Sequence, residues 1–312
     1  MKTLKRNLMI KSLLLIPFTL IIQSNTGSGR LSSQKLKEES WKFPQKDTLF
    51  LETHGSTKVF ISGSNSGEIE IKLQYISKPD EIFEVNEIQR AIYLTENLLN
   101  YDSQRPTQTY FKEWTWIINV PHGTFIKCNG GSSDFEVTGF NGFFKADYGL
   151  GRFVITNVDG NIDILGAQLY TQIHDSKGSF NLSSAGGSIR ATGLTITGNS
   201  SFSSGMGSIK ISLARAPESD LYVFSNFNKV QVSFNGHPVT GYFEFIAMAD
   251  EGRIISPFKF DKEEVFMDDI KNYRNASDFG KKSEYKRNSF IRGDSKPKIT
   301  LHTIKGIAQL TR

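Results

Sequence analysis

The sequence predicts an all-β fold, a β-solenoid with roughly 18-residue coils that each contain two nine-residue turn-strand units. Three observations predict this fold. A nine-residue period runs from Ser133 to Ile211, apolar residues lie two apart within each unit, and glycine opens most units. In such a solenoid the coils stack, and together they bury a core that no single coil could bury.

The units start nine residues apart, with one two-residue insertion before Gly198. Seven of the nine starts are glycine, although only 27 of the 312 residues are glycine, so chance does not explain the pattern. Residues two and four after a start are mostly apolar, as Phe144 and Ala146 are, and side chains two apart share one face of a strand. The glycine before them can take the positive φ angle that turns a corner. The starts are Ser133, Gly142, Gly151, Gly160, Leu169, Gly178, Gly187, Gly198 and Gly207.

The coil length follows from an alternation of large and small side chains seven residues after the starts. Because the alternation repeats every second unit, one coil contains two units. The repeats are clearest over residues 133–213. The alternating side chains, of which Ser176 fits least well, are Phe140, Gly149, Val158, Ala167, Ser176, Ala185, Leu194 and Gly205.

The chain begins with a predicted secretory signal peptide over residues 1–26. Basic residues such as Lys5 and Arg6 precede an apolar run at 13–22. This run is shorter than the about 20 apolar residues of a stable membrane span. We therefore expect export to the periplasm, the outer surface or the medium, and an integral membrane protein only if the leader remains as an uncleaved anchor. Cys128 is the only cysteine, so we expect a buried core thiol, no lipid-modified N-terminal cysteine (not a lipoprotein) and no intramolecular disulfide.

Downstream of the leader, the composition predicts a linker and one structural domain. Residues 27–46 are polar and small, which is typical of a linker. Residues 47–312 are expected to form a single β-solenoid domain, with early strands at 49–51 and 58–61. A further strand is expected in the β-type run 114–121, and it ends at a proline, which cannot continue a β-ladder.

Residues 81–100 fit two kinds of element. Their apolar residues approximate helical spacing, but the run at 91–94 suits a strand, and we favour the strand. Residues 214–312 are expected to add C-terminal strands and a basic loop. An open β-stack must protect its ends from pairing with other molecules, so segments 47–75 and 297–310 are expected to include the caps.

The charge of the chain argues against nucleic acid as a partner. The formal net charge is +5, but residues 1–26 contain four Lys and Arg and no acid, which leaves 33 basic against 32 acidic residues. Nucleic-acid binding is not expected of an exported chain that is nearly neutral. Residues 272–312 contain ten Lys and Arg against three acids, so this tail either contacts an acidic polymer or is a solvated loop of mixed charge.

The outward positions of the units show no catalytic pattern. No two carboxylates stack, so the acid pair of a glycoside hydrolase is missing, and aspartates do not recur at one place as calcium-binding repeats require. We expect no catalytic residues, no metal site and no cofactor. An alternative, a carbohydrate-active enzyme on a β-helix, requires an acidic cluster between the repeats and the segment 261–269. Its acids are Glu263, Glu264, Asp268 and Asp269.

Aromatic side chains are the candidate ligand surface. Phe143 and Tyr170 each follow a unit start by one position and are expected to point outward on different faces. Exposed rings on a rigid stack can contact sugars or protein edges. Trp114 and Trp116 are further candidates for stacking on sugar faces, with the alternative that the pair is divided between core and surface.

The order of motifs over residues 47–312 resembles the bacterial putative-adhesin family, an exported β-strand-repeat domain of unknown function. A tryptophan-containing strand ends in a Pro-His-Gly-Thr turn, a Cys-Asn-Gly-Gly sequence opens the units, and Gly-x-Ile/Phe-x-apolar units follow. Two later strands and a closing run complete the order. The matching segments are Val120-Pro121-His122-Gly123-Thr124, Cys128-Asn129-Gly130-Gly131, the units, 241–245, 252–255 and 297–306.

The resemblance implies a β-solenoid and an exported location, and it brings no catalytic residues. The chain departs from the family's usual Gly-Asp or Gly-Asn turn, with Gly-Arg at Gly151 and Gly-Ser at Gly178, which weakens any ladder of acidic ligands. Our first hypothesis is a non-enzymatic, exported adhesin or envelope scaffold that binds an envelope or cell-surface protein or glycan, with the oligomeric state left open. The others are the carbohydrate-active enzyme and a periplasmic partner in envelope signalling.

Overall fold

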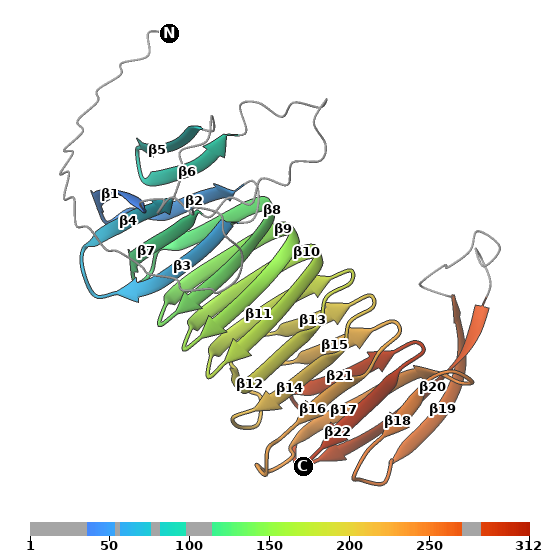
Figure 1. Cartoon of the computed structure of the whole chain (residues 1–312). Helices are drawn as coiled ribbons and strands as arrows, with labels where there is room; N and C mark the ends of the chain where they lie inside the picture. Colours follow the sequence, from blue (N-terminus) through green and yellow to red (C-terminus); the bar gives the residue numbers. More distant parts are fainter. Residues whose placement is uncertain (1–35, 54–56, 76–81, 98–113, 270–281) are drawn as a thin grey trace, which may run out of the picture.

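The computed structural model describes residues 36–53, 57–75, 82–97, 114–269 and 282–312 (Figure 1). The predicted signal peptide lies outside the described residues, as do residues 27–35 of the predicted linker and part of the basic loop. The linker prediction is wrong for the rest of that segment, because residues 37–44 form a strand. Every regular element among the described residues is a β-strand, so the predicted all-β class is confirmed. No described residue belongs to a helix that has the length and apolarity needed to cross a membrane.

The strands together form a long stack. Residues 81–100 contribute two of them, which confirms the strand prediction there. The bounds are β1 Lys37–Pro44, β2 Thr48–Thr53, β3 Thr57–Ser64, β4 Glu68–Tyr75, β5 Ile82–Ile88, β6 Ala91–Asn97, β7 Thr115–Pro121, β8 Phe125–Thr138, β9 Asn141–Thr156, β10 Asp159–His174, β11 Lys177–Ser184, β12 Ile189–Ile196, β13 Ser200–Ser204, β14 Ile209–Leu213, β15 Leu221–Ser225, β16 Val230–Ser233, β17 Gly241–Met248, β18 Arg253–Ile255, β19 Lys262–Asp269, β20 Lys282–Arg292, β21 Lys298–Thr303 and β22 Ile307–Thr311.

The stack has two layers that face each other across the core. The long strands β8, β9 and β10 pass through both layers, since β9 pairs with β10 along residues 141–148 and again along 150–156. We call layer 1 the side that continues through β11, β13, β15 and β21. Layer 2 is the side that continues through β12, β14, β16 and β22.

The strands within each layer pair in parallel at regular sequence offsets. In the middle of the stack the partners are 18 residues apart, as at Phe125 and Phe143 or at Thr171 and Ile189. The offset grows to 20 between β12 and β14 and to 21 between β14 and β16. The turns between the layers therefore lengthen toward the C-terminal end.

Glycine is required where neighbouring strands approach most closely. Gly160 pairs with Gly142 on one side and with Gly178 on the other. Its φ angle is +156°, and a Cβ at this position would overlap the carbonyl oxygen of Gly142. The glycines at the unit starts therefore allow both the corner and the close stacking of successive strands.

Aromatic and aliphatic side chains from both layers fill the core. Phe144 of layer 1 lies 6.3 Å, centroid to centroid, from both Phe135 and Phe153 of layer 2. Phe135 and Phe153, on adjacent strands, stack at 4.8 Å. Cys128 is fully buried as predicted, and burial raises the pKa of its thiol far above its usual value. The main core cluster thus extends along the stack, and a small second cluster lies at the C-terminal end.

Antiparallel strands close the N-terminal end. In layer 2, β4 pairs antiparallel with both β7 and β1, and in layer 1, β5 pairs antiparallel with β6. The expected cap at 47–75 is therefore only partly right. Its β4 belongs to the end, but β2 and β3 have strand partners on both sides, and the edge strands are β1 and β5.

The C-terminal strands are inserted into the stack and do not cap it. β21 pairs with β15 on one side and with β17 on the other, and β22 pairs with β16 and β18. Figure 1 shows these red strands between elements that precede them in the chain. The expectation that 297–310 forms a cap is therefore wrong, because the antiparallel strands β20 and β19 extend layer 1 beyond β17.

Candidate functional site

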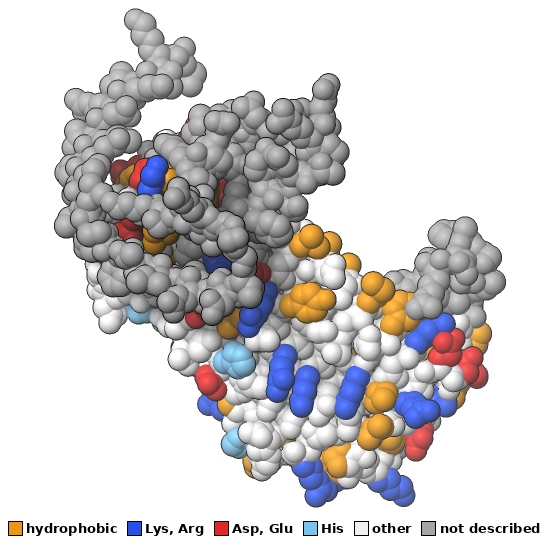
Figure 2. Space-filling model, viewed as in Figure 1, with side chains coloured by type: hydrophobic (Ala, Val, Ile, Leu, Met, Phe, Trp, Pro, Cys, Tyr) orange, Lys and Arg blue, Asp and Glu red, His pale blue; other side chains and the backbone are white. Residues whose placement is uncertain are grey.

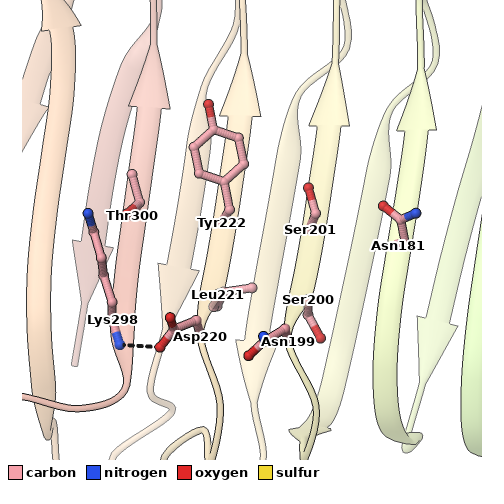
Figure 3. Close-up of a pocket in the computed structure, with 9 residues that line it drawn as sticks. All are labelled: Asn181, Asn199, Ser200, Ser201, Asp220, Leu221, Tyr222, Lys298 and Thr300. Atoms are coloured by element: carbon pink, nitrogen blue, oxygen red, sulfur yellow. Dashed lines mark hydrogen bonds between the residues drawn. The ribbon is translucent and has the colours of Figure 1, made fainter.

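A polar hollow lies on the outer face of layer 1. Side chains alternate along each strand, so the apolar residues of β11, β13, β15 and β21 point into the core and the residues between them lie on the other face. On β21 the residues of that other face, Thr300 and His302, are nevertheless buried. One outward row runs across these strands through Asn181, Ser201, Tyr222 and Thr300, which occupy equivalent register positions. Asn181 and Ser201 are much shorter than Tyr222, so they leave an open hollow of about 410 Å³ beside its ring (Figure 3).

Hydrogen bonds between side chains and the backbone fix residues that line the hollow. Asp220 accepts a 2.8 Å hydrogen bond from the backbone N–H of Lys298, which ties the start of β15 to the start of β21 (Figure 3). Ser200 accepts from the backbone N–H of Phe180 and donates to the carbonyl oxygen of Gly198. The hollow therefore requires the inserted C-terminal strand. Its lining residues are Asn181, Asn199, Ser200, Ser201, Asp220, Leu221, Tyr222, Lys298 and Thr300.

Tyr222 provides the aromatic surface of the hollow. Its side chain is 38% exposed, and its ring lies 6.3 Å from that of Phe224 at a small interplanar angle. Its hydroxyl group lies 3.0 Å from Nδ1 of His302. Burial, with a smaller contribution from the carboxylate of Glu244, raises the pKa of Tyr222 above its usual value. The phenol is therefore neutral at physiological pH.

The charges around the hollow are largely compensated. The Nζ atom of Lys298 lies 2.9 Å from a carboxylate oxygen of Glu244, and it lies 5.7 Å from the ring centroid of Tyr242. On the opposite side, Asn181 donates a 3.2 Å hydrogen bond to Asp163, which also pairs with Lys145 at 3.1 Å. Asp220 is the one carboxylate among the lining residues. The hollow therefore offers amides, hydroxyls, one acid and one ring.

The predicted acidic segment lies away from this hollow and away from the units. Glu263 and Glu264 are on β19, which pairs only with β20 beyond the end of the stack in the described structure. Glu264 accepts a 2.9 Å hydrogen bond from Arg287 and also pairs with Lys262, and these two partners lower the pKa of Glu264. The side chains of Asp268 and Asp269 lie outside the described residues. Among the described residues no three His, Cys, Asp or Glu side chains are grouped to hold a metal ion.

The tryptophans predicted as a ligand surface are core residues. Trp116 is fully buried and donates a 2.8 Å hydrogen bond from Nε1 to the buried carboxylate of Glu96. Trp114 is 2% exposed and lies edge-on to Phe83 at 5.9 Å. The prediction of a sugar-stacking role for this pair is therefore wrong, because neither ring has an accessible face.

The other two predicted residues lie on different layers, as their alternation indicated. Phe143 is on layer 1, half-buried and stacked on Phe125 at 4.8 Å. Tyr170 is on layer 2 and is 51% exposed. Neither lines the hollow, and the structure does not bring them together. The sequence reasoning missed Tyr222, Asp220 and Lys298, because the unit pattern is lost before Leu221.

Comparisons with known proteins give weak similarities. No protein-family model and no curated protein matches the chain. A solved structure of a putative cell adhesion protein from Clostridium sporogenes aligns with a TM-score of 0.30 and 15% identity, covering 89% of this chain and 99% of that one. A putative lipid binding protein from Parabacteroides distasonis gives 0.37 and 10%, covering 64% and 89%. A putative adhesin from Parabacteroides merdae gives 0.34 and 12%, covering 65% and 90%.

At TM-scores below 0.5 these similarities leave the function to be argued from the chain's own residues. Two of the three proteins bear an adhesion name.

Proposed function

We propose that this protein is an exported, non-enzymatic β-solenoid that binds a neutral glycan on a cell surface, in the manner of an adhesin. The observation that carries the proposal is the hollow on layer 1, in which the Tyr222 ring stands beside short amide and hydroxyl side chains. The 18-residue offsets between parallel partners support roughly 18-residue coils in the middle of the solenoid.

The chemistry of the hollow suits an uncharged sugar. A pyranose ring has an apolar C–H face that packs on an aromatic ring, and hydroxyl groups at its edge that exchange hydrogen bonds with amides and hydroxyls. Tyr222 offers the ring, while Asn181 and Ser201 lie in the same row. Because Lys298 is paired with Glu244, a free anion gains little from this cation.

Binding without catalysis is supported by the distribution of acids. Hydrolysis of a glycosidic bond by the usual mechanisms needs two carboxyl groups on either side of the bond. Asp220 is the one carboxylate among the residues that line the hollow, and it already accepts a hydrogen bond from the backbone of Lys298. Glu264 of β19 is paired with Lys262 and Arg287 beyond the end of the stack. We therefore expect recognition of a sugar without its cleavage.

A glycan array with the purified protein, followed by titration of the best neutral ligand, tests this function. Substitution Tyr222→Ala should weaken binding by about five- to thirtyfold, because a stacked ring contributes on the order of 1–2 kcal/mol. Tyr93→Ala is the matched control. This tyrosine is also on layer 1 and packs on a neighbouring ring, Phe50, at 4.6 Å, but it lies at the N-terminal end.

The control variant should bind the neutral glycan as the unchanged protein does. The proposal fails if no neutral glycan binds, if both variants lose the same affinity, or if the bound glycan is cleaved during long incubation. Thermal melting of each variant shows that the fold is retained.

A further inference from the structure

The outer face of layer 2 carries unpaired positive charge. From β10 to β18, three outward rows cross this layer, and they contain Arg190, Lys210, Lys229 and Arg253 but no Asp or Glu. We call these four residues, with Tyr170 and Arg152 at the N-terminal side, the cationic strip. Figure 2 shows a row of Lys and Arg side chains across the middle of the molecule with no acidic side chain among them.

The register places the charges next to one another. Arg190 of β12 is the direct parallel partner of Lys210 of β14, so their backbones are about 4.8 Å apart. At the N-terminal side, Arg152 of β9 lies between Tyr170 of β10 and Asp134 of β8, so the strip ends at this acid. Neighbouring like charges at this spacing repel each other. A bound anion would remove that repulsion.

Two cations of layer 1 differ from these four residues. Lys145 pairs with Asp163 at 3.1 Å and Lys177 with Asp159 at 3.4 Å. Within the described part of the chain, no carboxylate lies within ion-pair distance of Arg190, Lys210, Lys229 or Arg253. Their charge is therefore available to a ligand from solution.

The side chains between the charges suit a sugar polymer. Ser188 and Ser208 lie in the row of Tyr170 and Lys229, and Gln172 and Gln231 flank Arg190 and Lys210. Amides and hydroxyls bond sugar hydroxyl groups, which lie beside the carboxylate or sulfate groups of an acidic polysaccharide. Arginine binds such groups with two parallel hydrogen bonds. The ring of Tyr170, 51% exposed, can pack on a sugar face at one end.

We propose that the cationic strip binds an anionic polysaccharide, carboxylated or sulfated, as a second site that is independent of the hollow on layer 1. A polysaccharide is favoured over nucleic acid because hydroxyl and amide side chains fill the strip and Tyr170 is its single aromatic residue. A single-stranded nucleic acid is normally held by a series of stacking rings.

Binding of purified protein to heparin and to polygalacturonate, with dextran and single-stranded DNA for comparison, tests the strip. In 50 mM NaCl the two acidic polysaccharides should bind and dextran should not bind at the strip, and affinity should fall as salt rises, because charge interactions at a surface are screened. The double variant Arg190→Gln/Lys210→Gln should lower the affinity for the more tightly bound of the two acidic polysaccharides at least tenfold.

The double variant Lys145→Gln/Lys177→Gln is the matched control, since it removes the same net charge from cations that already have carboxylate partners. It should change the affinity less than twofold. Tyr222→Ala should also leave polyanion binding unchanged, which separates this site from the hollow.

Three results would overturn the proposal. The first is an equal loss of polyanion affinity in the two double variants, which would show that binding responds to net charge alone. The second is absence of binding to both acidic polysaccharides, and the third is tighter binding to DNA than to either of them.

Discussion

At the scale of single residues, close stacking makes certain glycines irreplaceable. Gly160 has neighbouring strands on both sides, and a Cβ at this position would overlap the backbone of Gly142. Since the obstacle is backbone, it cannot move aside as a flexible side chain can. We expect Gly160→Ala to lower the free energy of unfolding by about 3 kcal/mol or more, measured by denaturant titration.

Gly67 provides the matched control for this substitution. It lies in the turn between β3 and β4, and a Cβ added there meets no atom within 4 Å. Gly67→Ala should change the unfolding free energy by less than about 0.5 kcal/mol. Similar losses in both variants would contradict the view that close strand approach, and not glycine itself, sets the requirement.

At this scale, the sequence itself indicates where the two tryptophan side chains lie. Trp114, Trp116, Ile118 and Val120 are two residues apart in turn, and side chains two apart share one face of a strand. Ile118 and Val120 are typical core residues, so the same alternation places both tryptophans in the core, where the structure has them. The burial of both rings therefore follows from their positions along the strand, whereas the type of side chain alone does not indicate it.

At the scale of elements, the inserted strands β21 and β22 connect two parts of the stack. They provide the only strand partners that β17 and β18 have toward the rest of the stack in the described structure. Deletion of residues 298–312 should therefore free residues 241–292 from the stack. Limited proteolysis with mass spectrometry should show new cleavage within 241–292, while residues 125–213 stay protected.

A point substitution keeps this test interpretable if the deletion variant aggregates. Leu301 is fully buried in β21, and Leu301→Ala should cost about 3 kcal/mol through lost burial and a cavity. It should raise cleavage in the same C-terminal region. Equal cleavage throughout the stack, or no change after deletion, would contradict the connecting role of β21 and β22.

The insertion could not be predicted from the sequence, whereas the middle of the stack could. Between Phe125 and Thr192 the parallel pairs from β8 to β9, β9 to β10, β10 to β11 and β10 to β12 join residues 18 positions apart, so the pattern of glycine and apolar residues reports the spatial register directly. Ile299 instead pairs with Leu221 and Phe243, residues 78 and 56 positions earlier. No periodic signal links such distant segments, and the hollow on layer 1 depends on that pairing.

At the scale of the whole molecule, the two layers present different chemistry to solvent. Layer 1 carries a nearly neutral hollow with paired charges, and layer 2 carries a strip of unpaired cations. Because the packed core lies between the two layers, a ligand bound to the outer face of one layer need not disturb the outer face of the other layer. Such an arrangement suits a protein that connects two surfaces, one through a neutral glycan and one through an acidic polymer.

The proposed role requires that both faces be accessible outside the cell, which leads to the last prediction. Protease added to intact cells should digest the protein, and mass spectrometry of its N-terminus should show a mature start near residues 24–30, because the basic start and apolar run of the leader are typical of a cleaved signal peptide. A cytoplasmic protein should stay intact in the same cells as the control. Protection until the envelope is broken would contradict display at the surface and favour a periplasmic scaffold or signalling partner. A retained leader would instead indicate an anchored protein, whose layers reach only ligands close to the membrane.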